Sequence, residues 1–103
     1  MNDNERDGID ELVHMVMVEQ YEAAQQGKLS HWTIFHRPAD WPDGYIARRF
    51  EVGGGTGVPV ATSANLAGGD GALAMLRHVF EAAGLVCMTR SDEDHPSVVE
   101  TWM

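Results

Sequence analysis

Hydrophobic residues near the start of the chain recur every three or four positions, which is typical of one face of a helix. These residues are Ile9, Leu12, Val13 and Val16. Asp7 is a suitable N-cap and Gly27 a suitable terminator, so the pattern predicts a helix over residues 8–26. Three further apolar residues lie off this stripe, namely Met15, Val18 and Tyr21. A helix that is apolar on more than one side is either deeply buried or shared with a second subunit.

Runs of β-branched and aromatic residues predict strands over residues 32–36 and 45–52. The loop that joins them over residues 38–44 is rich in turn-forming residues, so we expect an antiparallel hairpin with a long connection. After a glycine-rich break, a short strand is expected over residues 58–62. Pro59 restricts that strand to the edge of a sheet or to a strand start.

The second half of the chain predicts one more helix and two more strands. Asp70 is expected to cap a helix over residues 71–83 that ends at Gly84. Its apolar face comprises Leu73, Leu76, Val79, Phe80 and Ala83. Strands are expected over residues 85–89 and 97–102.

The order of these elements predicts an α+β fold, with an antiparallel-rich sheet of four to five strands and two helices packed on one face. The 103 residues are 44% hydrophobic and 22% charged, as in globular chains. We therefore expect a single α+β domain over residues 1–103, with residues 1–7 as a frayed N-terminus.

The charge balance argues against nucleic acid and membranes as partners. Seven Lys and Arg stand against 16 Asp and Glu, which gives a net charge of −9. Binding to phosphates needs clustered basic residues, and here only Arg48 and Arg49 are adjacent. The simplest interpretation of this negative charge is that it keeps the protein soluble. Two other interpretations are that it attracts a basic partner or that it mimics a nucleic acid.

The sequence also predicts a cytoplasmic location. The acidic first residues do not resemble a signal peptide, and no apolar run approaches the roughly 20 residues that span a bilayer. Cys87 is the only cysteine, so the chain forms no internal disulfide.

Several stretches match motifs shared by a group of small bacterial and phage-associated proteins. The motifs are W-T-[IV]-[YF], P-x-D-[aromatic]-P, A-R and D-x-P-x-[VI]-V-E-x-W, at residues 32–35, 38–42, 47–48 and 94–102. The chain therefore resembles that uncharacterised group. No activity is established for the group, so the resemblance implies no catalytic residue.

No catalytic, cofactor or metal site is predicted from motifs. Residues 69–74 fit the dinucleotide-binding string G-x-G-x-x-[GA], but Asp70 would repel a pyrophosphate and the chain lacks repeated βαβ units. The five histidines and the cysteine form no H-x-x-x-H, C-x-x-C or H-E-x-x-H pair. Cys87 lies in the middle of an apolar strand, where it is expected to be buried and inert.

Two charged residues lie on strand faces that are otherwise apolar. These are Arg48 on strand 45–52 and Glu100 on strand 97–102. Because a buried charge without a partner is costly, we expect a cross-strand Arg48–Glu100 ion pair in the core. A second alternative is that the two residues form the rim of a small pocket that binds an anion or another subunit. As a third alternative, the opposite strand faces point inward and both charges are solvated.

The loop around Trp41 is a candidate contact surface. Trp41 lies between Asp40 and Pro42, and either folds back as a lid on the core or stands exposed. Trp and Arg are enriched in interaction hot spots, and Arg37 lies in the same loop.

Two functional hypotheses follow. The first is a soluble, non-enzymatic interaction or regulatory module that acts as a homodimer or binds a protein partner. Its candidate contact residues are Arg37, Trp41, Arg48 and Glu100. The alternative is a small ligand- or metal-binding enzyme with a site built from His36, Asp40, Arg48 and Glu100.

Overall fold

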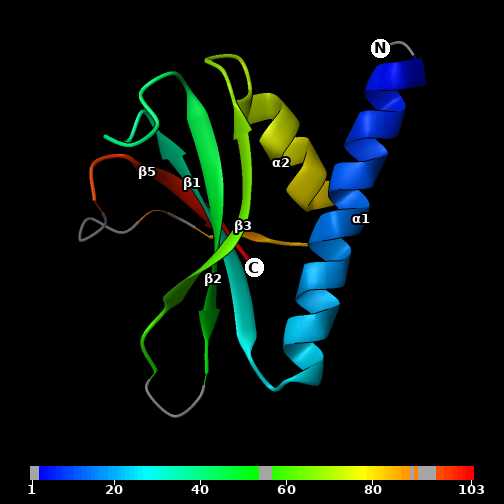
Figure 1. Cartoon of the computed structure of the whole chain (residues 1–103), viewed down its shortest axis with the longest axis vertical. Helices are drawn as coiled ribbons and strands as arrows, with labels where there is room; N and C mark the ends of the chain where they lie inside the picture. Colours follow the sequence, from blue (N-terminus) through cyan, green and yellow to red (C-terminus); the bar gives the residue numbers. More distant parts are fainter. Residues whose placement is uncertain (1–2, 54–56, 89, 91–94) are drawn as a thin grey trace.

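Two helices cover one face of a five-stranded antiparallel sheet (Figure 1). The helices are α1 (Asp3–Gln25) and α2 (Leu73–Ala82), and the strands are β1 (Leu29–His36), β2 (Tyr45–Val52), β3 (Val60–Gly68), β4 (Cys87–Met88) and β5 (Val98–Trp102). The strand order is β3-β2-β1-β5-β4. The computed structural model describes residues 3–53, 57–88, 90 and 95–103, with side chains from residue 8 onward. The predicted α+β fold is confirmed.

Helix α1 starts earlier than its hydrophobic pattern indicated. It begins at Asp3, so Asp7 lies inside the helix and the predicted N-cap is wrong. The first apolar residue within α1 is Ile9, and a hydrophobic stripe cannot mark the start of turns that lie ahead of it. The predicted end is confirmed, because Gly27 has φ +70° and the Lys28 N–H donates to the Ala23 carbonyl over 2.9 Å.

Helix α2 begins at Leu73, after Ala72, and no side chain caps it. The predicted Asp70 cap is wrong, because the Asp70 carboxylate accepts a hydrogen bond from Arg37 over 2.9 Å instead. The predicted terminator is correct. Gly84 has φ +88°, and the Leu85 N–H donates to the Phe80 carbonyl over 3.0 Å.

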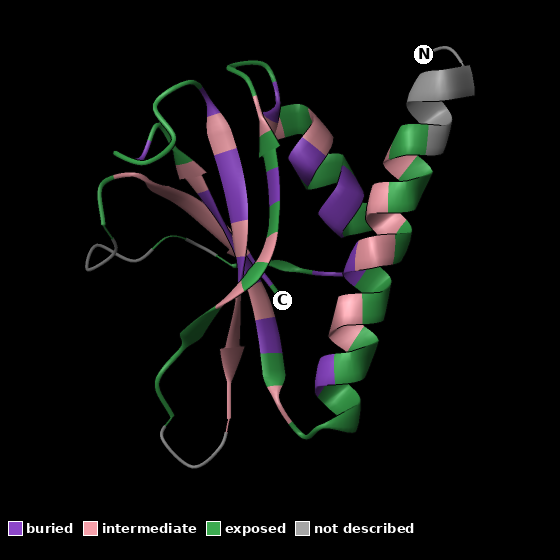
Figure 2. Cartoon of the chain, in the orientation of Figure 1, coloured by how far each residue is buried: buried purple, intermediate pink, exposed green. Residues whose placement is uncertain are grey.

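The core lies between the two helices and the sheet (Figure 2). The sheet contributes Trp32, Ile34, Ala47, Leu66 and Trp102, while the helices contribute Val16, Leu76, Val79 and Phe80. The ring of Phe80 lies 5.5 Å from Trp32 and 5.9 Å from Trp102, as measured between centroids. This cluster joins both helices to the middle of the sheet.

Strand β3 lies at one edge of the sheet, as Pro59 indicated, but it is longer than expected. It runs over Val60–Gly68 rather than residues 58–62. Its later residues, S-A-N-L-A-G, have low strand propensity, so antiparallel pairing with β2 must hold them extended.

Strand β4 is the opposite edge and is short. Cys87 and Met88 pair with Trp102 and Thr101 of β5, and Cys87 is exposed, so the predicted buried cysteine is wrong. An edge strand of two residues has too few neighbours to bury both of its faces. Partial desolvation and the nearby Glu100 carboxylate still raise the pKa of the Cys87 thiol above its usual value.

Candidate functional site

A buried guanidinium links α1 to the sheet. The side chain of Arg49 is on the β2 face that packs against the helices, and the residue is 3% exposed. Its Nε donates to Ser30 Oγ over 2.8 Å, and an Nη donates to Glu51 Oε1 over 2.8 Å. The other Nη lies 3.5 Å from Glu19 Oε2 on α1. The guanidinium is thus paired with two carboxylates and a hydroxyl.

Gln20 extends this network to the aromatic core. Its Oε1 accepts hydrogen bonds from the Ser30 hydroxyl and, over 3.2 Å, from Trp32 Nε1. Its Nε2 donates to the Ser30 carbonyl over 3.0 Å. Across the described part of the chain, no buried side-chain nitrogen or oxygen lacks a hydrogen-bond partner. These hydrogen bonds, with the ion pair between Glu19 and Arg49, hold α1 against β1 and β2.

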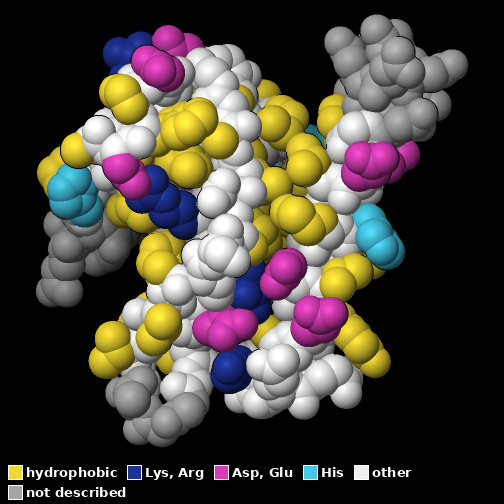
Figure 3. Space-filling model, viewed as in Figure 1, with side chains coloured by type: hydrophobic (Ala, Val, Ile, Leu, Met, Phe, Trp, Pro, Cys, Tyr) yellow, Lys and Arg dark blue, Asp and Glu magenta, His cyan; other side chains and the backbone are white. Residues whose placement is uncertain are grey.

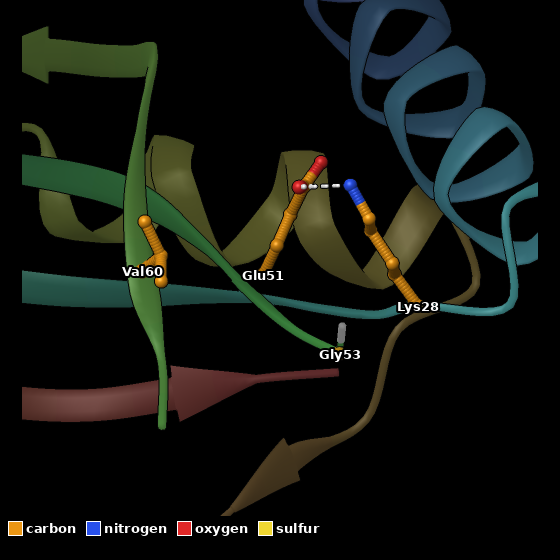
Figure 4. Close-up of a pocket in the computed structure, with 4 residues that line it drawn as sticks. All are labelled: Lys28, Glu51, Gly53 and Val60. Atoms are coloured by element: carbon orange, nitrogen blue, oxygen red, sulfur yellow. Dashed lines mark hydrogen bonds and ion pairs between the residues drawn. The ribbon is translucent and has the colours of Figure 1, made fainter. Parts of the chain in front are cut away.

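A hollow of about 190 Å³ lies beside this network, lined by Lys28, Glu51, Gly53 and Val60 (Figure 4). In the close-up, the Lys28 ammonium and the Glu51 carboxylate point toward each other, 3.4 Å apart. The hydrogen bond from Arg49, with the Lys28 charge, holds the pKa of Glu51 below its usual value. The charges that line the hollow are thus already paired with one another.

The predicted Arg48–Glu100 ion pair is wrong. Strand β1 separates the two residues, because Arg48 lies opposite Thr33, and Thr33 lies opposite Thr101 on β5. Arg48 is on the face away from the helices, where an Nη donates to Asp40 Oδ2 over 2.5 Å. That hydrogen bond lowers the pKa of Asp40. The guanidinium also lies 5.4 Å from the centroid of the Phe35 ring.

Glu100 lies on the other face of the sheet, below α2. Its carboxylate accepts hydrogen bonds from Arg77 Nε over 2.8 Å and from Trp102 Nε1 over 3.2 Å. Burial raises the pKa of Glu100, but these hydrogen bonds outweigh burial and lower it. Glu100 therefore serves as an anchor for α2.

The hydrogen bond between Arg48 and Asp40 ties the loop between β1 and β2 to the outer face of β2. The Trp41 N–H donates to the Pro38 carbonyl over 2.9 Å, and the Trp41 side chain is about one-third exposed (36%). Gly44 closes the loop with φ +153°, and a Cβ there would lie 2.4 Å from the Gly69 carbonyl carbon. Trp41 is thus neither fully buried, as a lid on the core would be, nor fully exposed to solvent.

The four residues of the predicted enzyme site do not converge. Asp40 and Arg48 form an ion pair, but β-sheet alternation places His36 and Glu100 on the helix face, opposite to Arg48. The ring of His36 stacks on Tyr45 with centroids 4.3 Å apart. Among the residues that the structure describes, no three His, Cys, Asp or Glu side chains group closely enough to hold a metal ion.

Two exposed surfaces remain as candidates for binding. One is the edge of β3, for which the sequence predicts a short strand over residues 58–62 and no role in binding. The other is the outer side of α1, which exposes 51% of Met17, 37% of Val18 and 65% of Tyr21. Val18 and Tyr21 were expected off the core stripe, whereas Met15 packs against the core. The role of Arg37, Trp41, Arg48 and Glu100 in binding stays a prediction.

The structure is that of a small α+β protein with two exposed surfaces, the β3 edge and the outer side of α1. No family model, curated protein or solved structure matches the chain. The resemblance to the bacterial and phage-associated group stays a prediction, and Asp94 of its tail motif lies outside the described residues. Neither described helix is both long and apolar enough to cross a membrane.

Proposed function

We propose that the chain is a non-enzymatic interaction module that acts as a homodimer, in which two copies pair through β3. The observation that carries this proposal is the composition of the edge strand. Its nine residues, V-A-T-S-A-N-L-A-G, include no charged side chain, and Pro59 lies just outside it. Natural edge strands usually carry Lys, Pro or inward-pointing charges that prevent pairing with another chain.

The backbone of β3 is able to extend the sheet. Among the strands that the structure describes, β3 pairs with β2 on one side and with none on the other. A register shift opposite Arg49 interrupts the pairing, and Thr62 Oγ1 accepts the Ala64 N–H there over 3.2 Å. Beyond this bulge, residues 65–68 pair regularly with β2. Their outer edge provides a regular segment for a second strand.

Charge favours this edge over the rest of the surface for self-association. Two copies that each carry −9 repel one another, and the repulsion is smallest where charges are absent. In Figure 3 the surface over the upper part of β3 is mainly white, which marks uncharged groups. A two-fold axis at this edge would pair β3 with itself in antiparallel orientation and form one continuous sheet.

The test is the mass of the protein in solution. By sedimentation equilibrium, we expect twice the chain mass of 11.3 kDa. The double substitution Ala61→Lys/Ala67→Lys places lysines on two exposed β3 positions that lie opposite Phe50 and Ile46. We expect it to weaken the dimer by about tenfold or more, because it adds repulsion at the shared edge.

The control is Val86→Lys/Met88→Lys, which changes the net charge equally near the opposite edge. Both side chains are exposed, at 66% and 47%. This variant should remain dimeric. A wild-type protein that stays monomeric at high concentration, or a control that dissociates as readily as the β3 variant, would contradict the proposal.

A further inference from the structure

The outer side of α1 carries a short strip formed by the apolar residues Met17, Val18 and Tyr21 together with His14. These residues follow one another at helical spacing on the side that does not face the sheet, and all four are exposed. With Glu22 they line a hollow of about 360 Å³. Apolar side chains that lie exposed next to one another are typical of a docking surface.

Acidic residues flank the strip at both ends. Asp10 and Glu11 lie one turn before His14, and Glu22 follows Tyr21, and all three are exposed. From residue 8 to its end, α1 contains no Lys or Arg. Figure 3 shows yellow and magenta side chains in succession along this helix. The surface therefore combines apolar contact area with a negative rim.

We propose that this strip binds an amphipathic, cationic segment of a partner protein, a helix with apolar residues on one side and Lys or Arg beside them. The apolar side chains of such a helix would cover Met17 and Val18 and remove them from water. Its cations would reach the rim carboxylates, and the face of the Tyr21 ring is a further partner for a cation. Apolar burial supplies affinity, and the charges select the partner.

The charge pattern argues against a second copy of this chain as the occupant. Two α1 helices packed strip to strip would bring Asp10, Glu11 and Glu22 of both copies together, and neither helix offers a Lys or Arg from residue 8 onward to offset them. The strip is also separate from β3, so this inference does not depend on the proposed dimer.

The probe is a fluorescent helical peptide of about 18 residues built from Lys and Leu in amphipathic order, and the comparison peptide has Glu in place of Lys. Fluorescence anisotropy at physiological salt should show binding of the Lys peptide and at least about tenfold weaker binding of the Glu peptide. The Val18→Lys substitution should weaken the Lys peptide by about tenfold or more. Tyr21→Lys, at a position that is 65% exposed, should do the same and guards against a folding defect at Val18.

Val86→Lys is the matched control, because it makes the same exchange at a valine outside α1. It should change the affinity by less than about twofold. Equal weakening by Val18→Lys and Val86→Lys would overturn the proposal in favour of general charge attraction. Dissociation of a dimer by Val18→Lys would overturn it in favour of a second copy. The β3 double variant should bind the Lys peptide normally, which separates this result from the fate of the dimer.

Discussion

Replacement of Arg49 by alanine is expected to lower the free energy of unfolding by about 3–5 kcal/mol. The guanidinium is almost fully buried and hydrogen-bonds to Ser30 and Glu51, with Glu19 close by. Its removal leaves the Ser30 hydroxyl with fewer partners and takes the shared cation away from the Glu19 and Glu51 carboxylates at the contact between α1 and the sheet. Urea unfolding followed by circular dichroism, at one fixed protein concentration, measures the change.

Arg48→Ala is the control, since it removes the neighbouring arginine from the other face of β2. Arg48 is partly exposed and its partner Asp40 is solvated. We expect Arg48→Ala to lower the free energy of unfolding by less than about a third as much as Arg49→Ala. Equal losses for the two variants would contradict the assignment of Arg49, rather than Arg48, to the helix-covered face.

Trp32→Ala is expected to cost a similar 3–5 kcal/mol or so, because it opens a cavity in the centre of the core. Trp32 is fully buried, packs against Phe80 and donates its indole N–H to Gln20. The variant therefore loses aromatic packing and leaves Gln20 with one hydrogen bond fewer. The midpoint of thermal unfolding should fall accordingly.

Trp41→Ala makes the same exchange in the loop between β1 and β2. Because Trp41 is already about one-third exposed, Trp41→Ala should lower the free energy of unfolding by at least about 2 kcal/mol less than Trp32→Ala does. Equal losses of stability in the two tryptophan variants would mean that Trp41 is a lid on the core, which is one of the two alternatives that the sequence leaves open.

Hydrophobic periodicity was sufficient to predict the fold class and most of the elements. The stripe Leu76, Val79 and Phe80 identified α2, and Gly27 and Gly84 marked the ends of both helices. Strand β3 was predicted too short because its residues are small and polar. Its extended form depends on pairing with β2, which is tertiary information that a local pattern does not contain.

The sequence does not predict the hydrogen-bond network around Arg49, for a different reason. Alternation along a strand separates two faces but does not say which face the helices cover, and β2 has apolar residues on both. The predicted ion pair requires that the Arg48 face of β2 and the Glu100 face of β5 both point to the helices. Only the second faces the helices, so the two charges lie on opposite sides of the sheet. The buried arginine is instead its neighbour, Arg49.

Amide hydrogen exchange across β3 tests the central claim, that two copies share this edge, most directly. Exchange would be compared at protein concentrations well above and well below the dissociation constant. Peptides that cover residues 60–68 should exchange more slowly at the higher concentration, while those that cover α2 stay unchanged. Identical exchange of β3 at both concentrations would show that its outer edge remains free and would contradict the account.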